Sequence, residues 1–259
     1  MLTHPLLPKL RQLKLSGMGL TLDTRAAQAL ERQLSPTEFL ALLLDDELER
    51  RSQQSLARRL KLSGCDQLKT LARFDFSTAP GVSRPFIQDL ASCTFINRHE
   101  NLLLTGPTGV GKSHLANALA IEALKRELRV LCRGTQRLLT DLHAARASGS
   151  DARFLTKLLT VDLLVLDDFG LQPLSPQAAQ DLYHIMAHRY ETGSLIITSN
   201  RAFEEWAEVF GNDLLASAAL DRLTHHCHTL VIRGLSYRQL SRRKEASGDP
   251  SASPADLVV

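Results

Sequence analysis

The amino-acid sequence predicts an α/β protein with a five-stranded parallel sheet, preceded by a small domain built only from helices. Three observations lead to this fold class. From about residue 76 to 235, short apolar runs alternate with helical stretches of connecting length, which is typical of a buried parallel sheet. A glycine-rich loop with the spacing of a phosphate-binding loop follows the first of these runs. Before residue 73, apolar residues recur at helical spacing instead.

The length of 259 residues suits one medium α/β domain and a smaller appendage. We place the helical domain at residues 1–72, the α/β domain at 73–244, and a tail rich in Ser, Pro, Gly and Asp, expected to be disordered, at 245–259. The four cysteines are widely spaced and form no CxxC pair, as expected for free thiols in a reducing compartment. The N-terminus lacks a signal-peptide pattern, and no apolar run approaches the ~18 residues of a membrane-spanning helix. We therefore expect a cytoplasmic protein without a membrane partner.

Two signals define the helices of the N-terminal domain. Ser16-Gly17-Met18-Gly19 interrupts the first series of regularly spaced leucines, so a second helix is expected to start after Asp23. Ser35-Pro36-Thr37-Glu38 is a strong start for a third helix, because it combines a capping hydroxyl, a first-turn proline and a glutamate that can reach back. That helix is expected to end near Ser63-Gly64.

Five apolar runs rich in strand-forming residues follow along the chain. The ends of the first, third and fourth runs carry polar residues, and ligands of parallel sheets bind beyond the carboxyl ends of the strands. The runs span residues 101–105, 129–132, 161–166, 194–199 and 229–232.

The first run leads into Gly106-x4-Gly111-Lys112-Ser113, and a helix is predicted directly after it. Glycines let backbone N–H groups turn towards phosphates, the helix N-terminus adds positive potential, and Lys112 can reach the β- and γ-phosphate oxygens. Ser113 can offer its hydroxyl to Mg²⁺. The pattern predicts Mg-ATP binding by Gly106, Pro107, Thr108, Gly109, Val110, Gly111, Lys112, Ser113 and His114.

The third run ends in two carboxylates, Asp167 and Asp168. A buried strand would deliver Asp167 beside the phosphate loop as a ligand for Mg²⁺, and Asp168 would orient or deprotonate the attacking water. Without a phosphate loop, the same residues would be read as a strand end and a turn. The fourth run ends at Asn200, which we expect near Asp168 and the γ-phosphate; the plainer interpretation is an asparagine that opens a turn.

The chain also resembles the IstB family, the AAA+ ATPase helpers of IS21-type insertion sequences, which are related to bacterial helicase loaders. The phosphate loop is common to many ATPases, whereas the blocks near the C-terminus are more particular to the family. The similar blocks cover nearly the whole chain apart from the tail: residues 69–76, 101–116, 189–191, 198–200, Trp206, 220–226 and 234–238.

This resemblance implies an AAA+ ATPase that oligomerises on duplex DNA and recruits or activates a transposase. It also implies ATP sites between subunits, with Arg222 of a neighbour neutralising charge on the transferred phosphoryl group. Arg238 is a further candidate nucleotide contact. Two departures from the AAA+ pattern stand out. Asp168 occupies a position that most often holds glutamate, and so few residues follow the last strand that the helical lid is expected to be absent or vestigial.

Charge gives independent support for DNA. The segment 112–157 holds nine Lys and Arg against four acidic residues, an excess larger than the net charge of +3 of the whole chain. Such a patch could neutralise phosphates, although a solvated helix face would have the same composition. The candidate DNA contacts are Arg137, Arg146, Arg153 and Lys157.

Three other functions share parts of this pattern: a helicase loader acting in replication, a monomeric small-molecule kinase, and a nucleotide-binding scaffold that does not hydrolyse ATP. The run His225-His226-Cys227-His228 suggests a metal site, but adjacent residues on one helix or strand cannot all face one ion. We therefore expect these histidines to have structural roles.

Overall fold

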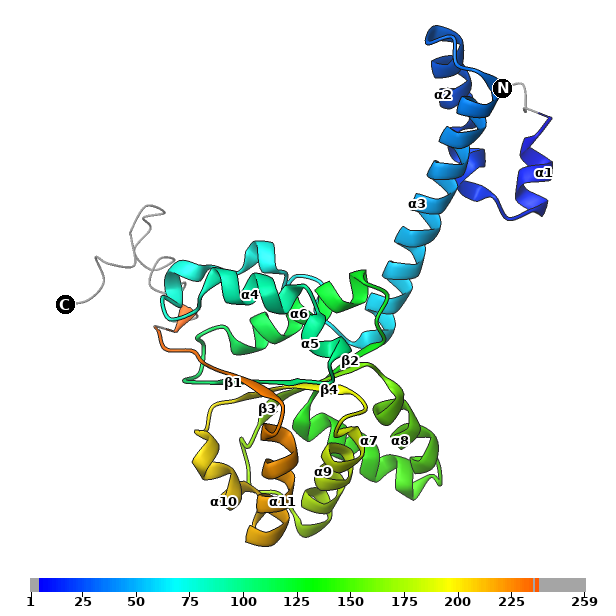
Figure 1. Cartoon of the computed structure of the whole chain (residues 1–259). Coiled ribbons are helices and arrows are strands. Elements are labelled where there is room, and N and C mark those ends of the chain that lie inside the picture. The colour runs from blue at the N-terminus through cyan, green and yellow to red at the C-terminus, as the bar shows by residue number, and fades with distance from the viewer. Residues whose placement is uncertain (1–4, 235, 238–259) are drawn as a thin grey trace, which may run out of the picture. The chain divides into compact units, whose positions relative to one another are not determined.

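The computed structural model of the chain describes residues 5–234, 236 and 237 (Figure 1). The chain forms two compact units, Met1–Arg59 and Leu60–Val259. This division lies earlier than the expected boundary at residue 72, because the segment after Leu60 packs on the α/β core. The amide of Asn117 exchanges hydrogen bonds with the backbone of Asp66 (2.8 and 2.7 Å), and the Sγ atoms of Cys65 and Cys132 lie 2.6 Å apart. The expected tail, 245–259, and Arg238 lie outside the described residues.

The N-terminal unit contains α1 (Leu7–Gln12), α2 (Ser16–Glu31) and most of α3 (Pro36–Ser63). Its small core joins α2 to α3 through Met18, Leu22 and Leu43. The predicted start of α3 is confirmed. Ser35 Oγ accepts a hydrogen bond from the N–H of Glu38 (3.3 Å), and Glu38 Oε2 accepts one from the N–H of Ser35 (2.7 Å).

The expected start of the second helix after Asp23 is wrong, because α2 begins at Ser16 and includes both nearby glycines. Gly17 is needed for close packing within this unit. A Cβ atom on Gly17 would lie 2.7 Å from the Cα of Glu47, closer than real Cβ atoms approach. The N–H of Gly17 donates a hydrogen bond to Glu47 Oε2 (2.6 Å), which gives a partner to an N–H in the first turn of α2.

The second unit is built on the predicted sheet of five parallel strands, in the order β2-β3-β4-β1-β5. The central strands are almost wholly buried, whereas the edge strand β5 is half-buried. The strands are β1 (Asn101–Thr105), β2 (Val130–Gly134), β3 (Leu163–Phe169), β4 (Ser194–Ser199) and β5 (Cys227–Val231).

Helices cover both faces of this sheet (Figure 1). A large apolar core fills the space between the sheet and the helices of the second face, with Phe169, Trp206 and Phe210 among its fully buried side chains. The first face carries α4 (Arg84–Ala91), α5 (Thr94–Asn97) and α6 (Lys112–Lys125); the second carries α7 (Thr135–Ala147), α8 (Asp151–Thr160), α9 (Pro176–Arg189), α10 (Trp206–Phe210) and α11 (Asp213–Thr224). Short 3-10 helices span Leu71–Arg73, Phe76–Thr78 and Phe203–Glu205.

β1 and β4 have the predicted bounds, and the other strands differ from the prediction by one to three residues at an end. The largest difference concerns β3, which continues through both aspartates to Phe169. Its pairing with β4 shifts register between Leu166 and Phe169, and Asp168 has a left-handed backbone with φ +56°. The extra residue of such a bulge re-aims the side chains around it.

Arg189 holds together the N-terminal ends of β3 and β4. Its side chain is buried, and its guanidinium donates hydrogen bonds to four backbone oxygens, those of Leu158, Val161, Asp162 and Ser194 (2.8–3.2 Å). Burial lowers the pKa of Arg189 to about 10.

The expected absence of a helical lid concerns residues 238–259, outside the described part of the chain. Among the described helices, none is both long and apolar enough to span a bilayer.

Candidate functional site

The predicted phosphate loop connects the end of β1 to the start of α6. All three of its glycines, Gly106, Gly109 and Gly111, have positive φ angles (140°, 89° and 96°). A Cβ on Gly106 would lie 2.1 Å from the backbone oxygen of Ile232, so no larger residue fits there. The loop therefore needs glycine for its backbone path and for its approach to the chain after β5.

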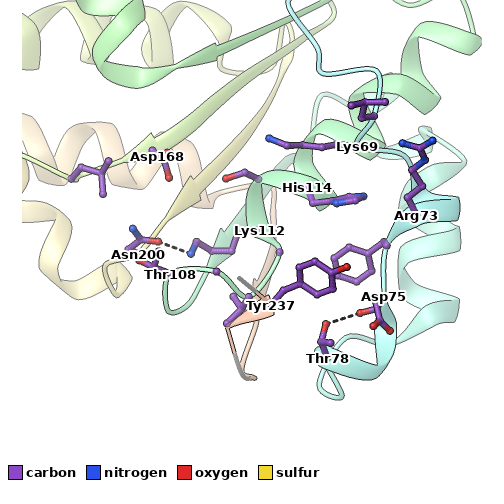
Figure 2. A pocket seen from close by; sticks show the side chains of 17 residues that line it. Lys69, Arg73, Asp75, Thr78, Thr108, Lys112, His114, Asp168, Asn200 and Tyr237 are labelled. Atoms are coloured by element: carbon purple, nitrogen blue, oxygen red, sulfur yellow. Dashed lines mark hydrogen bonds between the residues drawn. The ribbon is translucent and has the colours of Figure 1, made fainter. Parts of the chain in front are cut away.

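Lys112 is the first residue of α6, and its side chain turns back over the loop (Figure 2). Nζ donates hydrogen bonds to the backbone oxygens of Gly106 and Pro107 (2.8 Å each) and to Oδ1 of Asn200 (2.5 Å). Lys112 is only 4% exposed. Burial lowers the pKa of Lys112, while the nearby carboxylates of Asp168 and Asp167 oppose this shift. The ammonium group lies where the ends of β1 and β4 meet.

The two aspartates at the end of β3 are held by one hydroxyl from β4. Thr198 is fully buried, and its Oγ1 donates to Asp167 Oδ1 (2.5 Å) while accepting the backbone N–H of Asp168 (2.9 Å). Asp167 is half-buried and Asp168 is exposed. The bulge and Thr198 together orient the Asp167 carboxylate towards β4. The Asp168 carboxylate instead lies at the wall of a neighbouring cavity.

The phosphate loop, Asp168 and Asn200 line a cavity of about 590 Å³, within the usual size range of small-ligand sites. Figure 2 shows that it opens between the phosphate loop and the segment that precedes α4. Its wall includes residues 108–114 of the predicted ATP-binding set together with Asp168 and Asn200. Gly106 and Pro107 contribute through their backbone oxygens on Lys112.

Part of the cavity wall was not predicted as a site. The segment 68–78 supplies charged and aromatic side chains, and His114 Nε2 lies 2.8 Å from the backbone oxygen of Thr70, which ties this segment to α6. Phe74 packs edge-on against His114 and lies next to Gly111. The wall residues absent from the predicted set are Leu68, Lys69, Arg73, Phe74, Asp75, Thr78, Leu171 and Tyr237.

Asp167 and Arg222, predicted for metal binding and for catalysis, do not line this cavity. Asp167 lies behind Asp168, against Thr198. Arg222 lies in the last turn of α11, where Nη1 donates to the backbone oxygen of Ala218 (2.9 Å) and the guanidinium lies 5.4 Å from the ring centre of Tyr183. The fold thus does not bring Arg222 to the cavity of its own chain.

The candidate DNA contacts differ in their surroundings. Arg137 is exposed and paired with Asp141 (2.9 Å) on the same helix. Arg146 binds both carboxylate oxygens of the buried Asp181, so its charge is already compensated inside the fold. Arg153 and Lys157 are exposed and four residues apart on α8, which places them on one helix face.

Comparison with known proteins extends over nearly the whole chain. The sequence profile described as IstB-like ATP binding protein matches residues 8–246. A protein named as an ATP-binding protein of insertion sequence IS21 from Pseudomonas aeruginosa is 39% identical over 93% of this chain and 91% of its own length. A protein of an insertion sequence in Mycobacterium tuberculosis, also named for ATP binding, is 40% identical over 90% of this chain and 93% of its own length.

Solved structures show a similar fold. The DnaC helicase loader superposes with a TM-score of 0.52 and 27% identity, over 57% of this chain and 87% of its own. AMPPCP-bound DnaA from Aquifex aeolicus has a TM-score of 0.59 and 20% identity, over 75% of this chain and 59% of its own. At that identity, the DnaA similarity concerns the fold alone.

Proposed function

The chain belongs to the IstB-like ATP-binding protein family, and from this membership we propose that it is an Mg-ATP-dependent ATPase that assembles on duplex DNA during transposition. The observation that carries the proposal is the convergence of Lys112, Asp168 and Asn200 on one cavity behind a phosphate loop. The P-loop core of helicase-loader type is shared with DnaC. Hydrolysis, oligomerisation and recruitment of a transposase are the parts that we add.

Binding begins with an exchange of hydrogen bonds at Lys112. Its three N–H donors are taken by acceptors of the chain itself, so a phosphate oxygen must displace at least one of them. Asn200 Oδ1 is the acceptor that a side-chain rotation can move. We infer that a γ-phosphate takes the place of Asn200 on Lys112, which frees the Asn200 amide to face the same phosphate or the attacking water.

The residues present suit Mg²⁺, which prefers oxygen ligands. The Ser113 hydroxyl at the start of α6 and the Asp167 carboxylate are the groups that would hold it, because Thr198 occupies one Asp167 oxygen and the carboxylate has a second. Bound there, the ion would neutralise charge on the β- and γ-phosphates. Asp168, exposed at the cavity wall, is the residue that would orient the attacking water or accept its proton.

Arg222 has no role in the cavity of its own chain, so we assign it to the cavity of a neighbouring subunit. An arginine donated in trans stabilises charge that develops during phosphoryl transfer. This assignment makes hydrolysis depend on assembly. It also argues against a monomeric kinase, whose site would be completed by its own residues.

Arg153 and Lys157 are the strongest candidates for contacts to duplex DNA. Arg137, on α7, is a weaker candidate because it is paired with Asp141. Arg146 is not proposed as a contact, because its charge is paired with the buried Asp181, whose other partner among the described residues is the uncharged Gln177. If the protein contacts only DNA phosphates, it should show little preference for DNA sequence, and its affinity should fall steeply as the salt concentration rises.

The decisive experiment measures the mass of the purified protein by light scattering with ATP, with ADP and without nucleotide, each with and without duplex DNA. We expect assembly with ATP and larger complexes on DNA. Arg153→Gln/Lys157→Gln should reduce the slope of log K against log[salt] by up to about 2 units while ATP binding is unchanged. Arg98→Gln, which removes an exposed charge from the loop before β1, is the matched control.

The outcomes separate the remaining functions. Negligible affinity for duplex DNA, measured with ATP at low salt, contradicts the proposal of DNA binding. ATP turnover by a protein that does not assemble contradicts the proposal that the ATP sites lie between subunits. Similarity to DnaC keeps a helicase loader as the second candidate. Capture of a replicative helicase, rather than of a transposase, would favour it.

A further inference from the structure

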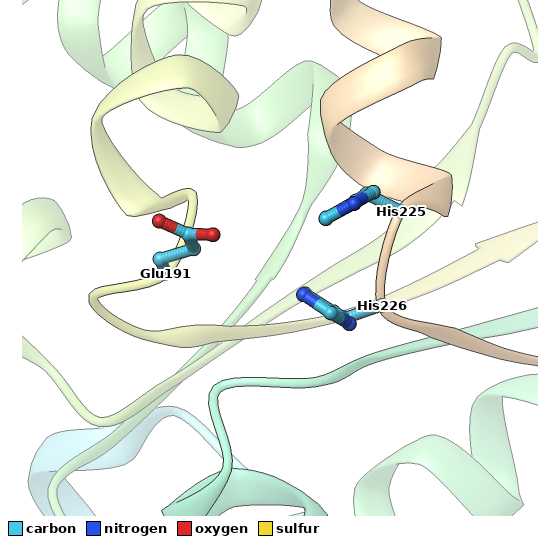
Figure 3. A group of neighbouring side chains, drawn as sticks. All are labelled: Glu191, His225 and His226. Atoms are coloured by element: carbon cyan, nitrogen blue, oxygen red, sulfur yellow. The ribbon is translucent and has the colours of Figure 1, made fainter.

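Outside the nucleotide site, three side chains converge where α11 passes into β5 (Figure 3). His225 follows the last residue of α11, His226 precedes the first residue of β5, and Glu191 lies in the turn after α9. One ligand atom from each residue lies within 4.8 Å of the other two. Figure 3 shows the carboxylate and both imidazole rings turned towards a common space.

The turn between helix and strand explains why two adjacent histidines can face the same way. Neighbours within a helix or a strand point apart, which is why the sequence argued against a shared ion. Here the helix ends at Thr224, and the two rings lie with centroids 4.2 Å apart. His228 belongs to the same run but points elsewhere, with its Nε2 2.8 Å from Glu100 Oε2.

The donor set determines which ion the cluster would bind. Two imidazole nitrogens and one carboxylate oxygen are the ligands of three-residue zinc sites, which leave a fourth position to water. Bonds of about 2.1 Å place neighbouring ligands of a tetrahedral zinc roughly 3.4 Å apart. All three side chains are exposed, so small rotations can close the remaining distance.

A neighbouring tyrosine already orients one of the rings. His225 Nδ1 lies 2.9 Å from the hydroxyl of Tyr190, which leaves Nε2 as the nitrogen available to an ion. Histidine ligands of metals commonly use their second nitrogen in this way, and the partner fixes both the tautomer and the ring orientation.

We propose that Glu191, His225 and His226 form a site for a divalent transition-metal ion, with Zn²⁺ as its occupant. The ion would join the turn after α9 to the end of α11, two segments otherwise joined there by the Tyr190–His225 hydrogen bond. Arg222 lies about one turn earlier on α11. The site does not depend on the proposed ATPase function, since none of its residues lines the nucleotide cavity.

The test is a calorimetric titration of the full-length, chelator-treated protein with Zn²⁺, together with its melting temperature. We expect one ion per chain and a higher melting temperature with Zn²⁺. Glu191→Gln, His225→Ala and His226→Ala should each weaken binding at least about tenfold, because losing even an outer-shell partner of a ligand costs about that much. His228→Ala and Cys227→Ser are matched controls from the same run and should bind normally.

Three results would contradict the proposed metal site. The first is no Zn²⁺ binding by the wild-type protein, and the second is an equal loss of Zn²⁺ affinity in the His228→Ala control. The third is a thiolate charge-transfer band when Co²⁺ replaces Zn²⁺. The last would assign the ion to a cysteine. Glu191→Gln keeps the shape of an exposed side chain, so full-affinity binding by this folded variant is also evidence against the proposal.

Discussion

The hydroxyl of Thr198 contacts both aspartates at the end of β3. It is buried, donates to the Asp167 carboxylate and accepts the N–H of Asp168. Thr198→Val keeps the shape but leaves both groups without this partner, at a cost of about 1–3 kcal/mol in the free energy of unfolding. We expect kcat for ATP hydrolysis to fall about tenfold and the Mg²⁺ requirement to rise, with ATP affinity little changed.

Thr198→Ser is the control, because it retains the hydroxyl and should keep most of the activity. A second variant, Asp168→Asn, should bind ATP but hydrolyse it slowly, which would trap the assembled state. Steady-state ATPase kinetics at several Mg²⁺ concentrations measures kcat for Thr198→Val, Thr198→Ser and Asp168→Asn. Equal kcat values for Thr198→Val and Thr198→Ser would show that the hydroxyl does not position the acidic pair.

Lys112 is the second residue whose contacts give a sharp expectation. In Lys112→Ala, the phosphates lose the one ammonium group of the loop, and a charge-assisted hydrogen bond is worth about 1.5–3 kcal/mol. ATP affinity should therefore fall at least about tenfold, and ATP-dependent assembly should disappear. A titration with fluorescent ATP measures the loss. Lys125→Ala, at the other end of α6 in an exposed pair with Glu122, should bind normally; wild-type affinity in Lys112→Ala contradicts the assignment.

At this scale the sequence predicts the loop, the acidic pair and Asn200 as site residues, because each follows an apolar run. It misses the cavity wall formed by residues 68–78, where Phe74 and Arg73 have no spacing that predicts a ligand. In the sequence, residues 69–76 of this segment carry a family resemblance and no ligand pattern. Its position depends on tertiary contacts, such as that between His114 and Thr70, which no local pattern encodes.

At the scale of elements, predictions succeeded where burial was uniform. β1 and β4 are buried along their whole length and have the predicted bounds. β5 is half-buried at the sheet edge, and its first two residues, Cys227 and His228, form no continuous apolar run in the sequence. The sequence misplaces the start of α2 for another reason: its glycines predict a break in a helix, although Gly17 allows close packing against Glu47.

The pairing of α2 with α3 includes an ion pair that should make the N-terminal unit sensitive to acid. Arg25 donates two hydrogen bonds to Asp46 (2.6 and 2.8 Å), and these lower the pKa of Asp46 to about 2, although burial opposes the shift. A carboxylate with a lowered pKa stabilises the fold above its unfolded pKa, near 3.8. That stability is lost as the pH falls from about 4 through about 2.

Asp46→Asn tests this expectation. Urea unfolding followed by circular dichroism should show the variant less stable than wild type at neutral pH, with the difference shrinking as the pH falls below about 4. Asp45→Asn, at the exposed neighbouring position, should show little effect. A difference between Asp46→Asn and wild type that stays constant with pH would mean that the ion pair does not contribute.

At the scale of the whole molecule, the main expectation concerns Arg222. Arg222→Ala should bind ATP nearly normally and hydrolyse it poorly, because the chain's own cavity lacks this residue. Mixing Arg222→Ala with Lys112→Ala should restore part of the turnover. In some mixed interfaces, an intact loop from one variant meets an intact arginine from the other.

Phosphate release from mixtures at a constant total protein concentration provides the measurement. The recovered activity should peak at intermediate ratios of the two variants. Mixtures no more active than the separate proteins would falsify the role in trans. Loss of ATP binding in Arg222→Ala would instead point to a role in folding, which circular dichroism would reveal.

The parallel pairing of β1 with β5 has a consequence for symmetry. The phosphate loop leaves the carboxyl end of β1, whereas α11, with Arg222 in its last turn, leads into the opposite end of β5. A head-to-tail contact between the loop of one subunit and Arg222 of the next would therefore join two different surfaces, whereas a twofold dimer would need the loop and Arg222 on one shared surface. Repeating a head-to-tail contact gives either a closed ring or an open helical filament. A ring holds a fixed number of copies, but a filament adds copies as the duplex lengthens, so complex mass measured against DNA length distinguishes the two.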